Sequence, residues 1–249
     1  MKRHPVLVVV LSSAAMLGNL AWAGSARQDS TERLQSSADV LKEISAAPDK
    51  GIPEEVLKNS KCIVVIPHLV KGGFIVGAKH GRGVAVCRTS AGWSAPAFVS
   101  VSGGSAGLQI GAEGVDLVML VMNDSGLRHL LSSKFEITGE GSAAAGPVGR
   151  HASAGTDWKL NSELLTYSRS RGIFAGLTLE GAVIEQDADS TVAIYGNDLP
   201  FKEILLGEVA APTSAAPFLR AVAKISHQAG AQEAREQAPE DHQKTDNRK

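Results

Sequence analysis

The sequence predicts an α+β fold, in which an antiparallel, glycine-rich β-sheet closes into a barrel or sandwich and N-terminal and C-terminal helices pack on it. Three observations predict this fold. Short β-rich segments separated by glycine or proline fill the middle of the chain. Segments with helical character lie toward both ends. The chain has 26 glycines but only 4% aromatic residues, which indicates many turns and close backbone approaches.

The N-terminal segment, residues 1–23, has the features of a secretory signal peptide. Lys2 and Arg3 precede an apolar run from Val6 to Leu17, and Ala21-Trp22-Ala23 forms a small-residue cleavage site. The run is too short to span a membrane as a helix, and an uncleaved signal anchor is the alternative. We therefore predict cleavage near Ala23 and export, to the periplasm or out of the cell.

The charge of the chain argues against nucleic acid as a partner. Without Lys2 and Arg3, the chain has 23 basic and 26 acidic residues, a net charge of −3. Binding to nucleic acid depends on lysine and arginine neutralising phosphates. No nucleic-acid partner is therefore expected.

A helical region is predicted from residue 28 to residue 59, interrupted by the segment APDKGIP. Asp29 and Glu32 form a capping pattern, and Pro53 suits the first position of a second, short helix. The first helix is either an amphipathic lid on the core or a membrane-surface helix. Its net acidic charge favours the lid, because membrane-surface helices usually carry lysine and arginine on the polar face. Its apolar positions are Leu34, Ala38, Leu41 and Ile44.

From about Lys61 to Gly196 the chain is dominated by predicted strands. The first three strands are expected at Cys62–Ile66, Gly73–Ala78 and Val84–Arg88. One helix, NDSGLRHLLSS, interrupts the series and is entered through Asn123. The six β-rich segments are CIVVIP, GGFIVGA, GVAVCR, APAFVSVS, GLQIGA and VDLVMLVM.

The two cysteines, Cys62 and Cys87, are disulfide candidates if the chain is exported. The alternative is two buried thiols in adjacent strands. In a meander of the three expected strands the cysteines would lie far apart, so a bond would mean that the sheet closes on itself. No C-x-x-C or paired histidine spacing accompanies them, and no metal site is expected.

Residues 103–107, Gly-Gly-Ser-Ala-Gly, match the G-x-S-x-G pattern of a hydrolase nucleophile. A nucleophile elbow needs a strand, a sharp turn at the serine and then a helix. Gly111 and Gly114 and a β-branched run follow Ser105, so the helix is missing. We interpret the pattern as a glycine-rich turn. With no acid/base pair or metal cluster elsewhere, no enzymatic activity and no cofactor are expected.

Several blocks of the middle region resemble, in order, those of the SYLF domain family. The resemblance covers about Gln35 to Gly207, and one departure is Thr191, where the family often has Asn. We divide the chain into a signal peptide (1–23), a SYLF-like domain (28–207), a C-terminal helix (208–228) and a disordered charged tail (229–249). The blocks are VIPHLVKGGFIVGAKHGRGVAVCR, GWSAPAFVSVSGGSAGLQIGAEGVDLVMLVMN, AAAGPVGR, YSRSRGIFAGLTLEGAVIEQD and YG.

The resemblance implies lipid binding, since family members bind phosphoinositides or other acidic lipids, and the eukaryotic members also bundle actin. For an exported protein, lipid binding is expected to carry over in class only, and actin binding is not expected. The residues expected to face a lipid headgroup flank the turns of the second and third strands. Ordinary solvated hairpin ends are the alternative interpretation for them. They are Lys71, Lys79, His80 and Arg82.

The sequence is therefore consistent with two functions. The first is a non-enzymatic module of the cell envelope that binds lipid or a membrane surface. The second is a structural or interaction module that binds an envelope protein through its β surface, by strand addition along an open sheet edge. The oligomeric state and the particular lipid or partner do not follow from the sequence.

Overall fold

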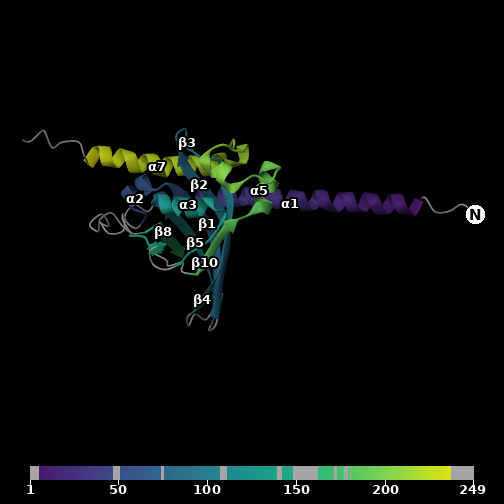
Figure 1. The fold of residues 1–249 in the computed structure, drawn as a ribbon, viewed down its shortest axis with the longest axis horizontal. Helices are drawn as coiled ribbons and strands as arrows, with labels where there is room; N and C mark the ends of the chain where they lie inside the picture. The colour runs from purple at the N-terminus through teal and green to yellow at the C-terminus, as the bar shows by residue number, and fades with distance from the viewer. Residues whose placement is uncertain are drawn as a thin grey trace, which may run out of the picture.

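The computed structural model confirms the predicted α+β class: one curled β-sheet carries helices on both of its faces (Figure 1). The sheet forms a half-barrel. The residues that the structure describes are 6–46, 51–73, 76–106, 111–138, 142–147, 162–170, 173–176, 179 and 181–236.

Two long hairpin strands, β1 and β2, lie at the centre of the sheet, flanked by β4 and β5. The order is β6-β10-β4-β2-β1-β5-β8-β7, with β3 paired to β2 and β9 to β8. The described pairings are antiparallel except that of β7 with β8. The strands are β1 (Cys62–Gly73), β2 (Val76–Thr89), β3 (Gly92–Trp93), β4 (Ala97–Ala106), β5 (Gly111–Val121), β6 (Lys134–Glu136), β7 (Ala143–Ala145), β8 (Leu164–Ser170), β9 (Ile173–Gly176) and β10 (Ala182–Gln186).

The three strands expected from the sequence are in fact two. The first runs on past Ile66 to Gly73. The second expected strand begins at this last residue of β1 and ends inside β2, with residues 74 and 75 outside the described residues, and the third is the later part of β2. The glycines of the GRG segment, Gly81 and Gly83, do not turn the chain but lie inside β2. A Cβ on Gly83 would lie 2.0 Å from the carbonyl oxygen of Val65, so glycine at this position serves close backbone approach.

Gly81 and Gly83 face an irregularity in β1. The register of β1 shifts between Ile66 and Leu69 against β5, and His68 has a φ of 57°. A Cβ on Gly81 would lie 2.6 Å from the side chain of Ile66. The two glycines therefore make room for the side chains at this β-bulge, which lets both strands continue.

Each face of the sheet is covered by helices, which explains the continuous apolar runs in the strands. We call the face under α1 (Val6–Ser45), α2 (Glu54–Asn59) and α7 (Ala216–Glu236) the α1 face. The opposite face, under α3 (Asp124–Leu131) and α6 (Phe201–Leu206), is the α3 face.

The interpretation of the first helix as a lid on the core is confirmed. Leu34, Ala38 and Leu41 are fully buried in the core of the α1 face. Ion pairs fix the helix at two places: Arg33 pairs with Asp187, and Glu43 pairs with Arg169. Arg169 also pairs with Asp116 of β5 at 2.6 Å.

The predicted signal peptide falls on the N-terminal part of α1, which extends away from the body of the protein in Figure 1. Side chains are described only from Gly24 onward. Within that part of the chain, no helix has both the length and the hydropathy to cross a membrane. Cleavage near Ala23 and export stay predictions.

The C-terminal region contains one helix that the sequence did not predict, α5 (Ala188–Tyr195). Asp187 caps it by accepting a hydrogen bond from the backbone of Ser190, and Gly196 ends it in the left-handed conformation. After a single 3₁₀ turn (Thr213–Ala215), α7 continues through Glu236, beyond the start of the predicted tail. Residues 237–249 lie outside the described residues, and the division into domains stays a prediction.

Cys62 and Cys87 form a disulfide, but not for the reason inferred from the sequence. They lie directly opposite each other on β1 and β2, with their Cα atoms 4.0 Å apart. The backbone N–H and carbonyl of Cys87 bond to Ser94 instead of Cys62, so the pair is a close, non-hydrogen-bonded one. The bond joins neighbouring strands of one hairpin and does not itself require closure of the sheet.

Candidate functional site

The most distinctive basic feature of the sheet is a pair of lysines, Lys71 and Lys79, that lie directly opposite each other on β1 and β2. Alternation along each strand places both on the α3 face. Beyond them toward the hairpin end, β1 and β2 contain only small residues at the paired positions Gly72–Ala78 and Gly73–Gly77. Among these described pairs, the lysines are therefore the large side chains on that face.

The lysine pair is partly buried, and its cross-strand neighbours are a glycine and a glutamate. Lys79 is only 7% exposed. A Cβ on Gly103 would lie 3.3 Å from its Cε atom, so its aliphatic stem covers that glycine. Both lysines make further polar contacts. The cross-strand row is Gly103, Lys79, Lys71 and Glu113, with two basic residues and one acidic residue.

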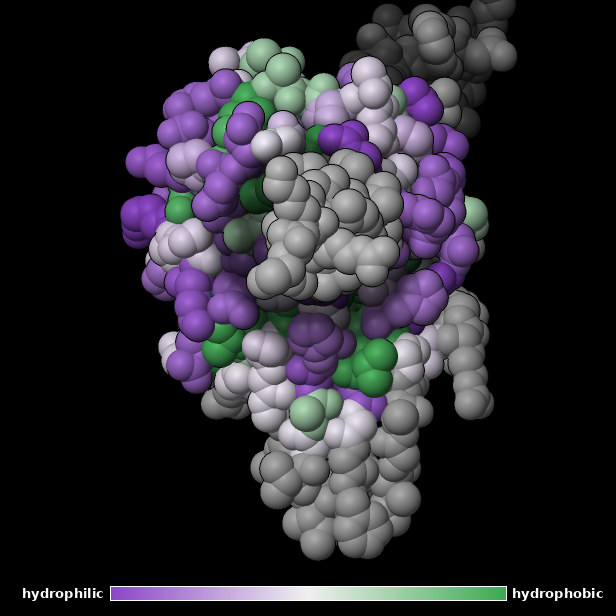
Figure 2. Space-filling view, turned by 90° about the vertical axis from the view of Figure 1, so that its right-hand side faces the viewer, coloured by the Kyte–Doolittle hydropathy of each residue, from purple (hydrophilic) through white to green (hydrophobic). Residues whose placement is uncertain are grey.

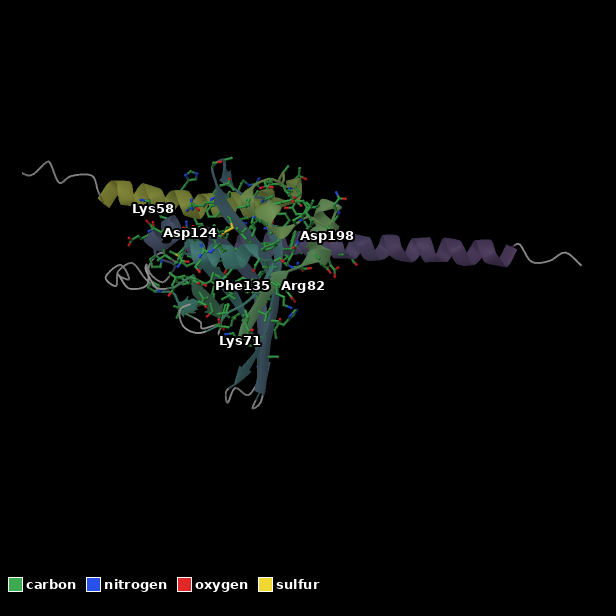
Figure 3. All side chains as sticks on the ribbon, viewed as in Figure 1. Lys58, Lys71, Arg82, Asp124, Phe135 and Asp198 are labelled. Atoms are coloured by element: carbon green, nitrogen blue, oxygen red, sulfur yellow. A yellow bond between two sulfur atoms is a disulfide. The ribbon has the colours of Figure 1, made fainter. Side chains whose placement is uncertain are left out.

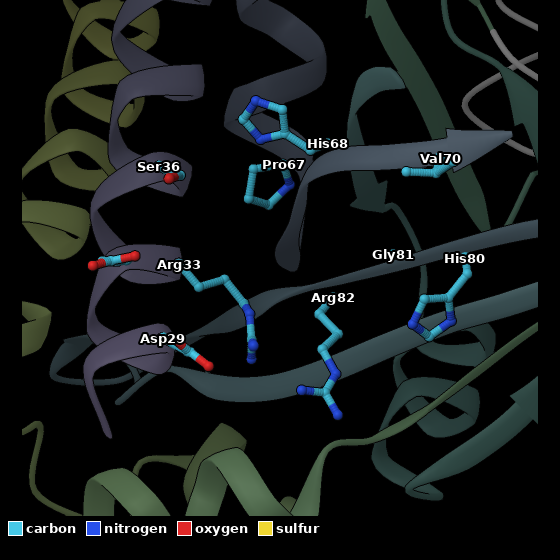
Figure 4. A pocket seen from close by; sticks show the side chains of 10 residues that line it. Asp29, Arg33, Ser36, Pro67, His68, Val70, His80, Gly81 and Arg82 are labelled. Atoms are coloured by element: carbon cyan, nitrogen blue, oxygen red, sulfur yellow. The ribbon is translucent and has the colours of Figure 1, made fainter. Parts of the chain in front are cut away.

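The other two predicted headgroup residues, His80 and Arg82, lie on the opposite face. They line an open groove of about 320 Å³ between α1 and the central hairpin, shown in Figure 4. Arg33 and Asp29 enter the groove from the helix side, both from α1. The structure thus brings Lys71 to Lys79 and His80 to Arg82, but it does not bring all four together.

The two arginines that line this groove, Arg33 and Arg82, belong to an ion cluster centred on a buried carboxylate. The Asp187 carboxylate, 4% exposed, accepts hydrogen bonds from Arg33 at 3.2 Å and from the Ser190 hydroxyl at 2.7 Å. The Arg82 guanidinium lies 3.5 Å from the same carboxylate. Burial lowers the pKa of Arg33, while Asp187 opposes that shift. The cluster ties α1, β2 and α5 together.

The groove is a poor site for an anion. Its two arginines are balanced by Asp29, Glu32 and the buried Asp187. Figure 2 looks onto the side from which α1 extends, and the uncovered surface there is mostly hydrophilic, with hydrophobic residues in small separate patches. Of the four predicted residues, Lys71 and Lys79 are the two that lie directly opposite each other.

Ser105 lies inside β4, where its backbone pairs with Gly77. The predicted turn at this serine is therefore wrong, because the strand runs through Ala106. Residues 107–110 lie outside the described residues, and the next described element is the strand β5, which begins at Gly111. A serine within a strand that continues into another strand lacks the geometry of a nucleophile elbow.

We expect that Ser105 does not react with a fluorophosphonate probe and that Ser105→Ala leaves any binding activity intact. The reason is that an unactivated serine hydroxyl is a weak nucleophile. Labelling is measured by intact mass, with a known serine hydrolase as positive control. Stoichiometric labelling at Ser105 would show that an activating base lies nearby after all.

Within the described residues, no group of three His, Cys, Asp or Glu side chains is placed to hold a metal ion. The nearest approach to a catalytic cluster joins α3 to the start of β8. The Glu163 carboxylate contacts Ser125 at 2.6 Å and His129 at 2.8 Å. Because serine and histidine each bond to the carboxylate and not to one another, this cluster does not form a nucleophile–base pair.

Comparison with known proteins agrees with the fold and the sequence blocks. The family model described as "Ysc84: Las17-binding protein actin regulator" matches residues 102–225, from β4 to α7. The chain is 35% identical over 173 residues to an SH3 domain-containing protein of Schizosaccharomyces pombe, covering 68% of this chain and 40% of that protein. It is 32% identical over 189 residues to SH3 domain-containing YSC84-like protein 1 of Xenopus laevis, covering 73% and 56%.

This chain belongs to the Ysc84, or SYLF, domain family. Protein YSC84 of Saccharomyces cerevisiae is a further relative, 35% identical over 176 residues, which are 69% of this chain and 37% of that protein. The chain thus spans about 40 to 56% of the length of the first two relatives. The family description is that of a binding and regulatory protein.

The family description corrects one expectation. We expected no actin binding, but the SYLF family model that matches this chain is itself described as an actin regulator that binds Las17. The error came from arguing that an exported protein does not meet actin, when export itself is untested. An actin-related partner therefore has to be considered.

The SYLF departure at Thr191 has a simple structural role in this chain. Thr191 is fully buried in the first turns of α5, and its hydroxyl donates to the carbonyl of Asp187 at 2.9 Å. A threonine hydroxyl can bond back to the carbonyl four residues earlier in a helix. The Thr191 hydroxyl is thereby satisfied within the first turn of α5.

Proposed function

We propose that this chain is a non-enzymatic module that binds an acidic membrane surface, in the cell envelope if the predicted export is correct. The observation that carries the proposal is the lysine pair, Lys71 opposite Lys79. Like charges directly opposite each other on an antiparallel pair destabilise the sheet. Both lysines already make polar contacts and Glu113 lies opposite Lys71 on β5, and an anionic headgroup would add a negative charge beside the two ammonium groups.

The shape of the hairpin supports the same function. In Figure 3, Lys71 lies low on the long strands, away from the helices. The neighbouring paired residues are glycine and alanine, so they offer little steric hindrance to a flat surface. Each lysine near an anionic membrane surface contributes about 1 kcal/mol to binding.

The test replaces both lysines, Lys71→Ser with Lys79→Ser, and measures co-sedimentation with phosphatidylglycerol liposomes. The loss of about 2 kcal/mol predicts binding roughly 30-fold weaker at low salt. The salt dependence should also flatten, because the variant has two fewer positive charges whose attraction to the anionic surface salt can screen. Arg82 is left unchanged, since its loss would disturb the Asp187 cluster.

The matched control is Lys134→Ser with Lys224→Ser, which removes the same charge from other elements, β6 and α7. Lys134 is 69% exposed and pairs with Glu185. This variant should bind nearly as the unchanged protein does. Unchanged sedimentation of the Lys71 and Lys79 variant at low salt, or an equal loss in the control, would contradict the proposal.

A protein partner is the second candidate function, and the family description favours it. The partner could be actin-related, as in the family description, or an envelope protein added along β6 or β7, the terminal strands of the sheet. Sedimentation with filamentous actin in the absence of lipid separates the first possibility from membrane binding. Pelleting with actin but not with liposomes would replace our first proposal by the second.

A further inference from the structure

A half-enclosed pocket of about 380 Å³ lies at the other end of the central hairpin. Its walls come from the α2–β1 junction, the end of β2, α3 and α6. Lys71 is nine residues along β1 from Cys62, so the pocket is roughly 30 Å from the lysine pair. In Figure 3, Lys58 and Asp124 lie beside the helices and Lys71 lies farther down the strands.

One side of this pocket is aliphatic. Leu205 is fully buried beneath it, and Leu127 is half-buried at its side. Leu206 is 41% exposed and is one of three large exposed hydrophobic residues in the described part of the chain. An exposed leucine beside a leucine-lined hollow is a surface that an apolar group would cover.

The other side of the pocket is basic. Lys58, Lys61 and Arg88 line it, and none of its lining residues is acidic. Lys61 pairs at 2.9 Å with Asp124, whose side chain is 75% exposed. Such exposed pairs are weak and screened by solvent, so Lys61 can exchange this partner for the anionic group of a ligand.

Arg88 has a fixed position in the wall. Its guanidinium donates to the carbonyls of Leu57 and Ser60 and lies 4.5 Å from the ring centre of Trp93. The disulfide adds to this order, because Lys61 and Arg88 are the direct sequence neighbours of the bonded cysteines. The basic side of the pocket is thus fixed in position at the start of β1 and at the end of β2.

We propose that this pocket binds a single-chain anionic amphiphile, such as a free fatty-acid carboxylate. The head group pairs with Lys61 and Lys58, and the chain lies against Leu127, Leu205 and Leu206. The volume is near the lower end of the range of about 300–1,000 Å³ for small-molecule sites, which suits one short chain better than a two-chain lipid. The proposal does not rest on the membrane-surface function, which uses a different part of the sheet.

The first test is calorimetry of decanoate binding to the full chain, below the micelle concentration. Saturable binding is expected, with affinity rising about fourfold for each methylene from hexanoate to decanoate. The affinity should stop rising once the hydrocarbon chain of the ligand is longer than the pocket. Decyl sulfate should bind and decyltrimethylammonium should not. No saturable binding at millimolar decanoate, or equal binding of the cationic amphiphile, overturns the proposal.

The second test uses variants with matched controls. Leu206→Ser should weaken decanoate binding about tenfold, because part of a buried leucine contact is lost. Lys61→Ser should weaken it about tenfold through loss of a charged hydrogen bond. Val192→Ser, at an apolar residue that is 43% exposed on α5, and Lys134→Ser on β6 should bind as the unchanged protein does.

The two proposals fail independently. The Lys71 and Lys79 variant should bind decanoate normally even if it no longer sediments with liposomes. Loss of decanoate binding in that variant, or no loss in Leu206→Ser, would show that the amphiphile binds elsewhere. The last probe is a phosphatidylglycerol with two short acyl chains. If it binds more tightly than decanoate, the assignment of the pocket to a single-chain ligand is contradicted.

Discussion

Removal of the disulfide by Cys62→Ala with Cys87→Ala should lower the free energy of unfolding by about 3 kcal/mol, the value expected for a closed loop of this size. The two cysteines are 25 residues apart in sequence and directly opposed in the central hairpin. Both are buried, at 0% and 2% exposure, so the folded state holds them together whether or not they are bonded. The main effect of the bond is therefore to restrict the unfolded chain.

Urea unfolding with and without reductant measures this effect. The unchanged protein should lose stability on reduction, and the double alanine variant should be insensitive to reductant. Without reductant, intact mass spectrometry should give a mass two hydrogens below the dithiol form. Quantitative alkylation of both thiols in native protein purified from its own compartment would show that the bond does not form there.

The glycines of β2 show which part of the strand pattern could not be predicted from the sequence. Glycine was interpreted as punctuation, so Gly81 and Gly83 appeared to separate two strands. In the structure these glycines lie inside β2, where the backbone and side chains of β1 come too close for any Cβ. A glycine that ends a strand and a glycine that permits a close approach look the same in one sequence.

The helices were easier to predict than the strands. Asn123 caps α3 through its side chain, and Leu34 and Leu41 are buried on one side of α1, as their spacing predicted. The residues that predict a helix in this way lie within the helix or within one or two turns of its ends. Strand pairing depends on distant residues, which is why the division of β1 and β2 differs from the prediction, while the cap of α3 and the buried side of α1 agree with it.

Part of the candidate site could have been predicted from the sequence. Lys71 and Lys79 lie four residues on either side of position 75, so a single hairpin centred there would have paired them. No such signal links Asp187 to Arg33 or Arg82. These residues are far apart along the chain, and only the packing of α1 and α5 against β2 brings them together.

Replacement of Asp187 by alanine should cost about 3–5 kcal/mol, because it leaves a buried charge without its partner. Arg33 is 10% exposed on its side chain and would lose the carboxylate to which it donates. Arg82 would lose the same neighbour, and the first turn of α5 would lose its cap. The contacts between α1, β2 and α5 therefore all weaken together.

Asp187→Asn separates the charge from the cap, since asparagine also accepts hydrogen bonds at a helix N-cap. It should still cost several kcal/mol, and adding Arg33→Met should recover part of that loss, because the pair is then replaced by neutral groups. The control is Asp39→Asn in the Asp39–Lys42 pair, whose side chains are 51% and 53% exposed. That exposed pair should contribute no more than about 1 kcal/mol. Urea unfolding compares the four variants, and a loss for Asp187→Asn no larger than that for Asp39→Asn would mean that the buried cluster does not hold α1 to the sheet.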